Sequence, residues 1–344
     1  MMKKKLFFIS IMIFGCSNFN GRSFKFTYEM DIKPSNGKKI ELLIPYPQSN
    51  KVQHISNIKI DSKLEYEIKN EARHGNKYIY IYSNEGTYEL TKIIMTFDVD
   101  RSEHQNQLYE KINPQSYLGA YSRVPTGKIF EGIINKNKLS KNDMRGVYDF
   151  VLSGMHYGKP TSVDNKYYKD PWLHGGEVYG MKGVTRDQVV ELYQKAKDEN
   201  SDYTFGNGNS IYACDIGVGN CTDYHSYFIS LNRTLKVPAR FHMGFSIPQT
   251  DEGTIEGYHC WADYFIDGEG WYPVDISEAD KNPDKKDYFF GTVNEHRVDM
   301  MIGRDFVLDE YNNGVVNLFI YPLLEIDDES SLDFTKRFSY QNLN

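Results

Sequence analysis

The sequence lacks the features that mark several classes of protein. No run of three or more lysine and arginine residues follows residue 5, and the formal net charge is −7. A nucleic-acid-binding protein needs a clustered basic surface, so nucleic acid is not an expected partner. The N-terminal apolar run, residues 6–14, is too short to span a bilayer, which takes about 20 residues. We find no internal repeat and no low-complexity tract. The 344 residues are enough for two globular domains.

The first residues have the order of a signal peptide. Residues 1–5 are basic, residues 6–14 are apolar, and a small residue, Gly15, precedes Cys16. The four residues that end at Cys16, Ile-Phe-Gly-Cys, resemble the lipobox of bacterial lipoproteins, in which the chain is cut before the cysteine and its thiol is acylated. The alternative is an ordinary signal peptide beside an incidental cysteine.

This resemblance predicts where the protein lies. Residues 1–15 are expected to be removed, and residues 16–22 to form a lipidated tether that anchors the protein to a membrane through Cys16. The protein is then extracytoplasmic, either periplasmic or on the cell surface. Ser17 favours sorting to an outer membrane, if the organism has one.

Cysteine is scarce, with four residues in the whole chain. If Cys16 carries lipid, an odd number remains, namely Cys214, Cys221 and Cys260, in a compartment where thiols are usually paired. We expect Cys221 to stay free. Cys214 and Cys260 are then a candidate disulfide pair, although the sequence does not show that their Cα atoms come within bridging distance.

The first half of the chain has the pattern of strands. Between Phe24 and Val99, apolar and polar residues alternate, and turn sequences such as Asn-Gly separate the runs. Residues 23–110 are predicted to form an antiparallel β-sandwich, and residues 111–142 a connecting segment.

The second domain is predicted over residues 143–330. Its first helix follows Asp143, a suitable N-cap, and has apolar residues at helical spacing. Residues 331–344 are predicted to be a C-terminal tail.

A glycine-rich turn and a helix flank Cys221. The stretch Gly-Val-Gly-Asn-Cys, residues 217–221, precedes a helix with an apolar stripe. The dipole at a helix N-terminus favours a thiolate, and the unpaired N–H groups there can bind an oxyanion. Cys221 is therefore a candidate nucleophile, and Asn220 a candidate cleft-lining residue. The alternative is a buried cysteine that packs as a small apolar residue.

A histidine and an aspartate follow on a predicted hairpin. Residues 257–265 and 271–275 read as two strands joined by Gly-Glu-Gly. On a paired hairpin, His259 and Asp275 can lie side by side on one face, and the carboxylate can hold the imidazole while its other nitrogen faces Cys221. This arrangement makes a weakly acidic thiol a competent nucleophile.

Four motifs between residues 207 and 280 carry a family resemblance. They are Gly-x-Cys before a helix, Pro-Ala-Arg at a strand entry (238–240), His-x-Trp (259–261) and Gly-Trp-x-Pro-Val-Asp (270–275). The chain resembles the transglutaminase-like, papain-related superfamily. The resemblance implies an α+β fold, in which a β-sandwich precedes a domain whose cysteine-bearing helix packs on an antiparallel sheet.

The resemblance also implies the chemistry. It assigns the nucleophile to Cys221, the general base to His259 and the acidic orienting residue to Asp275. A thioester would form on an amide or peptide substrate, and a water acceptor would make a protease or amidase, whereas an amine acceptor would make a transglutaminase. An envelope location suggests a protein or peptide substrate, such as a peptidoglycan peptide. The alternative is a catalytically silent, lipid-anchored binding or scaffolding protein.

A metal site is not expected around Cys221. His225 lies four residues after Cys221, and Cys260 follows His259, but successive strand residues point to opposite faces, so His259 and Cys260 are not expected to face one ion. No calcium loop is recognisable. We predict no metal and no cofactor. His225 is expected to support the helix or border the cleft, and Trp261 to wall the site or join the core. The sequence predicts no oligomeric state.

Overall fold

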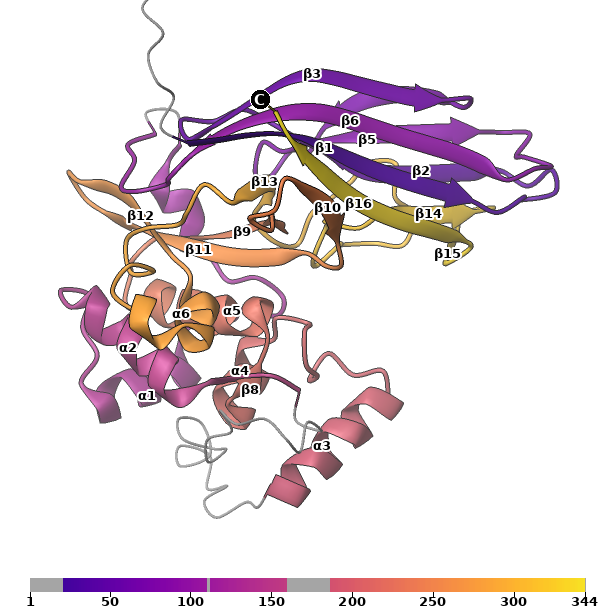
Figure 1. Cartoon of the computed structure of the whole chain (residues 1–344). Helices are drawn as coiled ribbons and strands as arrows, with labels where there is room; N and C mark the ends of the chain where they lie inside the picture. The colour runs from indigo at the N-terminus through magenta and orange to yellow at the C-terminus, as the bar shows by residue number, and fades with distance from the viewer. Residues whose placement is uncertain (1–20, 110–111, 160–185, 344) are drawn as a thin grey trace, which may run out of the picture.

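The fold is given by a computed structural model, which describes residues 21–109, 112–159 and 186–343 (Figure 1). The predicted signal peptide and Cys16 lie outside these residues, and so does most of the predicted tether. Its last two residues already belong to the first strand. Among the described helices, none is both long enough and apolar enough to cross a membrane.

Ten strands form the two antiparallel sheets of a β-sandwich (Figure 1). In spatial order, one sheet contains β10 (Glu252–Ile255), β16 (Phe334–Asn342), β1 (Gly21–Ile32), β6 (Thr91–Ser102) and β3 (Gln53–Ser62). The other contains β15 (Glu329–Ser331), β14 (Leu323–Ile326), β2 (Ile40–Tyr46), β5 (Lys77–Ser83) and β4 (Glu65–Asn70). Along β1 every second side chain is buried, which is the alternation expected of a strand with one face on the core.

The C-terminus is part of this sandwich, so the predicted tail over residues 331–344 is wrong. Strand β16 pairs with β1 over nine residues, from Phe24 opposite Asn342 to Ile32 opposite Phe334. Strand β14 pairs with β2 in the same way. Without these strands, one edge of β1 and one edge of β2 would expose unpaired backbone groups. The N-terminal half therefore needs strands from the far end of the chain.

A third sheet lies between the sandwich and the helices in Figure 1. Its order is β12 (Gly270–Val274), β11 (His259–Ile266), β9 (Ala239–Ser246) and β13 (Arg297–Ile302), all antiparallel. Phe245 in β9 packs on Phe26 in β1, with ring centroids 5.2 Å apart. The sheet is thereby joined to the sandwich.

The helices are α1 (Lys128–Asn137), α2 (Met144–Gly154), α3 (Arg186–Asp198), α4 (Ser210–Ile216), α5 (Cys221–Thr234) and α6 (Ile276–Lys281), with short 3-10 turns η1 (Pro114–Tyr117) and η2 (Pro283–Lys285). Helix α5 lies on the other face of the third sheet, and α1, α2, α4 and α6 pack on α5 (Figure 1). Helix α5 is almost entirely buried and packs on β11 and β9. The predicted cap of α2 is confirmed, because Asp143 accepts a 2.8 Å hydrogen bond from the N–H of Gly146. Two short strands, β7 (His156–Tyr157) and β8 (Val218–Gly219), pair in parallel just before α5. The predicted α+β class is confirmed.

A buried charged network joins the sandwich to the third sheet. Gln53 in β3 exchanges two hydrogen bonds with the backbone of Asp299 in β13, at 2.9 and 2.8 Å. His242 lies between two carboxylates, 2.9 Å from Asp299 and 3.1 Å from Asp263, and Asp263 also binds Arg240. Burial would lower the pKa of His242, but the two carboxylates raise it to about 8. These pairs hold β9, β11 and β13 in register beneath the site.

Candidate active site

Cys221 is the first residue of helix α5. The side chain of Asn220 caps this helix by accepting the N–H groups of Thr222 and Asp223, and the carboxylate of Asp223 accepts the N–H of Asn220 in return. This reciprocal capping box fixes where the helix begins. Asn220, predicted to line the cleft, thus has a capping role in this structure. The thiol of Cys221 lies in the first turn, where the helix dipole is positive.

His259 and Asp275 meet across the β11–β12 hairpin. The Nε2 atom of His259 lies 2.7 Å from Oδ2 of Asp275. The register pairs Ala262 with Val274, which brings Asp275 level with Trp261 and leaves His259 two residues further on. The two side chains therefore meet diagonally across the hairpin.

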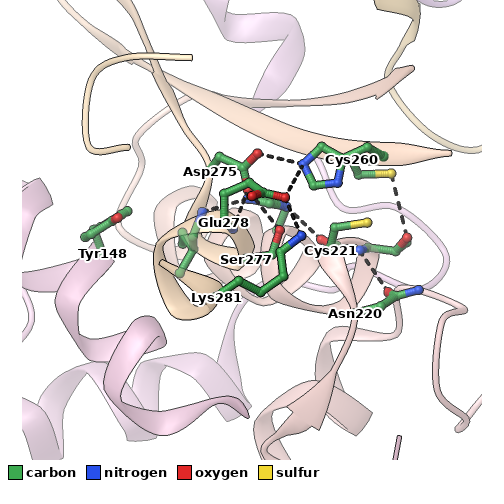
Figure 2. Close-up of polar contacts among 12 residues, drawn as sticks. Tyr148, Asn220, Cys221, Cys260, Asp275, Ser277, Glu278 and Lys281 are labelled. Atoms are coloured by element: carbon green, nitrogen blue, oxygen red, sulfur yellow. Dashed lines mark hydrogen bonds and ion pairs between the residues drawn. The ribbon is translucent and has the colours of Figure 1, made fainter. Parts of the chain in front are cut away.

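Four groups hold the carboxylate of Asp275, which is fully buried. Asp275 is the N-cap of α6, and its Oδ1 accepts the hydroxyl of Ser277 and the N–H of Glu278, at 2.8 and 3.0 Å (Figure 2). Its Oδ2 contacts His259 and, at 2.7 Å, Nη1 of Arg297. Burial would raise the pKa of Asp275, but His259 and Arg297 hold it well below its usual range. The carboxylate stays ionised.

Cys221 and His259 affect each other's pKa. The pKa of Cys221 is well below that of an ordinary thiol. Cys260 has the largest lowering effect, burial acts in the opposite direction, and His259 lowers the pKa further. Burial would lower the pKa of His259, but Asp275 and Cys221 raise it to about 9. Asp275 occupies Nε2, so Nδ1 is the ring nitrogen left for the thiol. The arrangement favours a thiolate beside an imidazolium.

Comparison with known proteins identifies the part of the chain that contains this site. A family model described as the transglutaminase-like superfamily matches residues 177–276, and the match includes Cys221, His259 and Asp275. This region is a transglutaminase-like domain. The resemblance stated from the four motifs is thereby confirmed, and the domain places the chain among thiol-dependent enzymes in general.

Other relatives match most of the chain at low identity. An uncharacterized protein of Haemophilus influenzae is 23% identical over 362 residues, which cover 91% of this chain and 88% of that protein. A solved structure from Cytophaga hutchinsonii, named a "Putative Cysteine Protease", is 14% identical with a TM-score of 0.48 and covers 93% of this chain and 98% of that one. The periplasmic domain of TgpA from Pseudomonas aeruginosa is 12% identical with a TM-score of 0.33, over 76% and 72% of the two chains.

Within the transglutaminase-like domain, the predicted disulfide between Cys214 and Cys260 is wrong. Cys214, Cys221 and Cys260 are all free thiols. Cys260 points at the start of α5, where its Sγ lies 3.7 Å from Oγ1 of Thr222. His259 and Cys260 are successive residues of β11, and both lower the pKa of Cys221.

His225 links helix α5, which begins at Cys221, to helix α6, which begins after Asp275. Its Nε2 must accept the N–H of Ile276, at 3.1 Å, so its Nδ1 donates to the carbonyl oxygen of Cys221, at 2.7 Å. Burial lowers the pKa of His225, and the ring is neutral. It ties the first turn of α5 to the first turn of α6, which is the supporting position expected for it.

Trp261 belongs to the core of the domain and has no exposed surface. Its ring stacks between those of His242 and His259, with centroid separations of 5.5 and 6.4 Å. It supports the imidazole from behind and does not line an open cleft.

Sequence reasoning missed Arg297, Ser277 and Glu278. The pattern Asp-x-x-Glu over residues 275–278 could have indicated a helix cap at Asp275. No motif marks Arg297, which lies beyond the matched region. Within the described ranges, no three histidine, cysteine, aspartate or glutamate side chains are grouped so that they could hold a metal ion.

Proposed function

We propose that this protein is an acyl-transfer enzyme that acts on amide or peptide substrates through a thioester on Cys221. The proposal depends mainly on how the ring of His259 is held. Its Nε2 lies 2.7 Å from the buried carboxylate of Asp275, and His259 and Cys221 each shift the pKa of the other toward the charged form. The site thereby supplies a nucleophile, a proton carrier and an orienting group.

The first half-reaction follows from these positions. The Cys221 thiolate attacks the substrate carbonyl carbon, and the oxyanion forms near the N-terminus of α5. The cap uses the N–H groups of Thr222 and Asp223, which leaves the N–H of Cys221 outside the cap as an oxyanion donor. The imidazolium of His259 then gives its proton to the leaving amine, the C–N bond breaks, and a thioester remains.

In the second half-reaction, neutral His259 accepts a proton from the incoming acceptor. The acceptor attacks the thioester, the C–S bond breaks, and the thiolate–imidazolium pair is restored. Asp275 keeps the same ring nitrogen bound throughout. Water as acceptor gives a peptidase or amidase, and an amine gives a transglutaminase.

The substrate and the location are part of the proposal. If Cys16 is lipidated, the protein is held at an envelope membrane, where proteins and peptides such as those of peptidoglycan are the accessible amides. Metabolic labelling with a fatty acid tests the anchor. Label is expected in the full chain and not in Cys16→Ala, and a labelled variant would contradict it.

Thiol reactivity tests the proposed nucleophile. Iodoacetamide alkylation of the purified chain is followed against pH, and each modified cysteine is mapped by mass spectrometry. Cys214 is a matched internal control, because it is 1% exposed and Cys221 is 3% exposed, while burial raises the pKa of Cys214. At pH 6 an ordinary thiol is less than about 1% ionised.

We expect Cys221 to react at pH 6 at least about 100-fold faster than Cys214. His259→Ala should slow Cys221 and leave Cys214 unchanged. If Cys221 follows Cys214 at every pH, the site has no activated thiol, and the silent binding protein becomes the better account.

A further inference from the structure

Arg297 contacts the carboxylate of Asp275. It is the first residue of β13, its side chain is buried, and its Nη1 lies 2.7 Å from Oδ2 of Asp275. Its Nε donates to Oδ1 of Asn294 at 3.3 Å, and its guanidinium carbon lies 5.3 Å from the ring centroid of Trp261. The guanidinium is thus held from two further directions.

Arg297 and His259 share one carboxylate oxygen. Nε2 of His259 and Nη1 of Arg297 each lie 2.7 Å from Oδ2 of Asp275. The distance between these two nitrogens is therefore no more than twice 2.7 Å. A guanidinium stays charged in proteins. It therefore attracts the carboxylate, and it repels a proton on the imidazole.

The other titratable groups around His259 belong to α5 and α6. They are Asp275, the N-cap of α6, Glu278 in α6 at 3.9 Å, and Cys221 and neutral His225 in α5. Glu278 is itself paired with Lys281. Burial has the largest effect on the pKa of His259 and lowers it. Among the described side chains with the next largest effects, Asp275 and Cys221 raise this pKa and Arg297 lowers it.

We propose that Arg297 is a positioning residue, which orients the Asp275 carboxylate toward His259 and sets the upper pH limit of the thiolate–imidazolium pair. The inference rests on the proposed function of Cys221. It adds a residue from β13, outside the region that matches the family model. Without the guanidinium, the imidazolium would keep its proton to higher pH.

The test compares two alkylating reagents on Cys221 in the full chain. Iodoacetate is an anion and is attracted by an imidazolium beside the thiolate, whereas iodoacetamide is neutral. The ratio of their rates at Cys221 therefore reports whether His259 is protonated, and it needs no substrate. In the wild type the ratio should fall around the pKa of His259, about 9. In His259→Ala it should be low at every pH.

Arg297→Gln keeps a hydrogen-bonding group but removes the charge, and Arg297→Lys keeps the charge. At the separation of these groups, loss of one charge moves a pKa by about one unit or more. In Arg297→Gln we expect the rate ratio to fall at a pH that is higher than in the wild type by that amount. In Arg297→Lys it should fall within about 0.3 pH unit of the wild type. Thermal unfolding checks that each variant is folded.

The two proposals fail in different ways. If wild-type Cys221 reacts as an ordinary thiol and the ratio does not change with pH, the proposed function fails. If the wild-type ratio falls as expected but folded Arg297→Gln falls at the same pH, only the role of Arg297 is contradicted. An equal shift in Arg297→Lys also contradicts it. If Arg297→Gln does not fold, Arg297→Lys decides: an unmoved profile supports the proposal, and a displaced one overturns it.

Discussion

Phe338 in the C-terminal strand should be among the most costly side chains of the molecule to truncate. It is 3% exposed and lies in β16, between β10 and β1. Its ring contacts those of Phe245, Tyr28, Tyr321 and Phe26, with centroid separations of 4.6, 4.7, 5.8 and 6.4 Å. Phe245 belongs to the third sheet, so the ring joins the sandwich to the sheet that carries His259.

Truncation of a buried phenylalanine to alanine costs about 3–5 kcal/mol, and each aromatic pair contributes up to about 1.5 kcal/mol. We expect Phe338→Ala to lower the free energy of unfolding by about 4 kcal/mol or more. Total stabilities are about 5–15 kcal/mol, so the loss is a large fraction of the whole. Leu332→Ala is the matched control, because Leu332 lies nearby in the sequence but is 88% exposed.

The assay is urea unfolding followed by tryptophan fluorescence, with the midpoint and slope compared between variants. Leu332→Ala should stay within about 0.5 kcal/mol of the wild type. If Phe338→Ala is no less stable than Leu332→Ala, the C-terminal segment is not part of the core, and the topology described above is wrong.

Two further predictions concern the buried network under the site. Arg240→Met leaves the buried carboxylate of Asp263 without its arginine and should cost about 3–5 kcal/mol, whereas Arg240→Met combined with Asp263→Leu should recover part of that loss in urea unfolding. No recovery would show that the pair is not coupled. His242 has a folded-state pKa of about 8, above its unfolded value of about 6.5, so its contribution is fully present below pH 6.5 and is lost as the pH rises through 8. The thermal midpoint should fall across this range, and His242→Gln should flatten the fall. An identical pH dependence in both proteins would contradict the assignment.

The sequence predicts the start of α5 and the contact of His259 with Asp275 because local signals define both. A glycine-rich turn followed by Asn220 fixes where the helix begins, and a short turn between two apolar runs brings two strands together. The diagonal offset of His259 and Asp275 depends on the hairpin register, which the turn sequence does not specify alone.

Long-range contacts explain what the sequence did not predict. Residues 334–342 have no local partner, and their pairing with β1 joins positions about 300 residues apart. The direction of the Cys260 side chain depends on how β11 packs against α5, so counting cysteines could not identify its neighbour. Arg297 carries no motif, and its role emerges only when β13 lies beside β9.

Trapping the thioester on Cys221 tests the proposed function most directly. The chain is mixed with p-nitrophenyl acetate, the initial burst of nitrophenol is measured, and the protein is mapped by mass spectrometry after acid quenching. If Cys221 is the nucleophile, we expect a burst of about one nitrophenol per chain and one acetyl group on Cys221. Cys221→Ala should show no burst, and His259→Ala should lose the acetyl group slowly. No burst in the wild type, or acetylation of Cys214 and Cys260 to the same extent as Cys221, would contradict a nucleophilic role for Cys221.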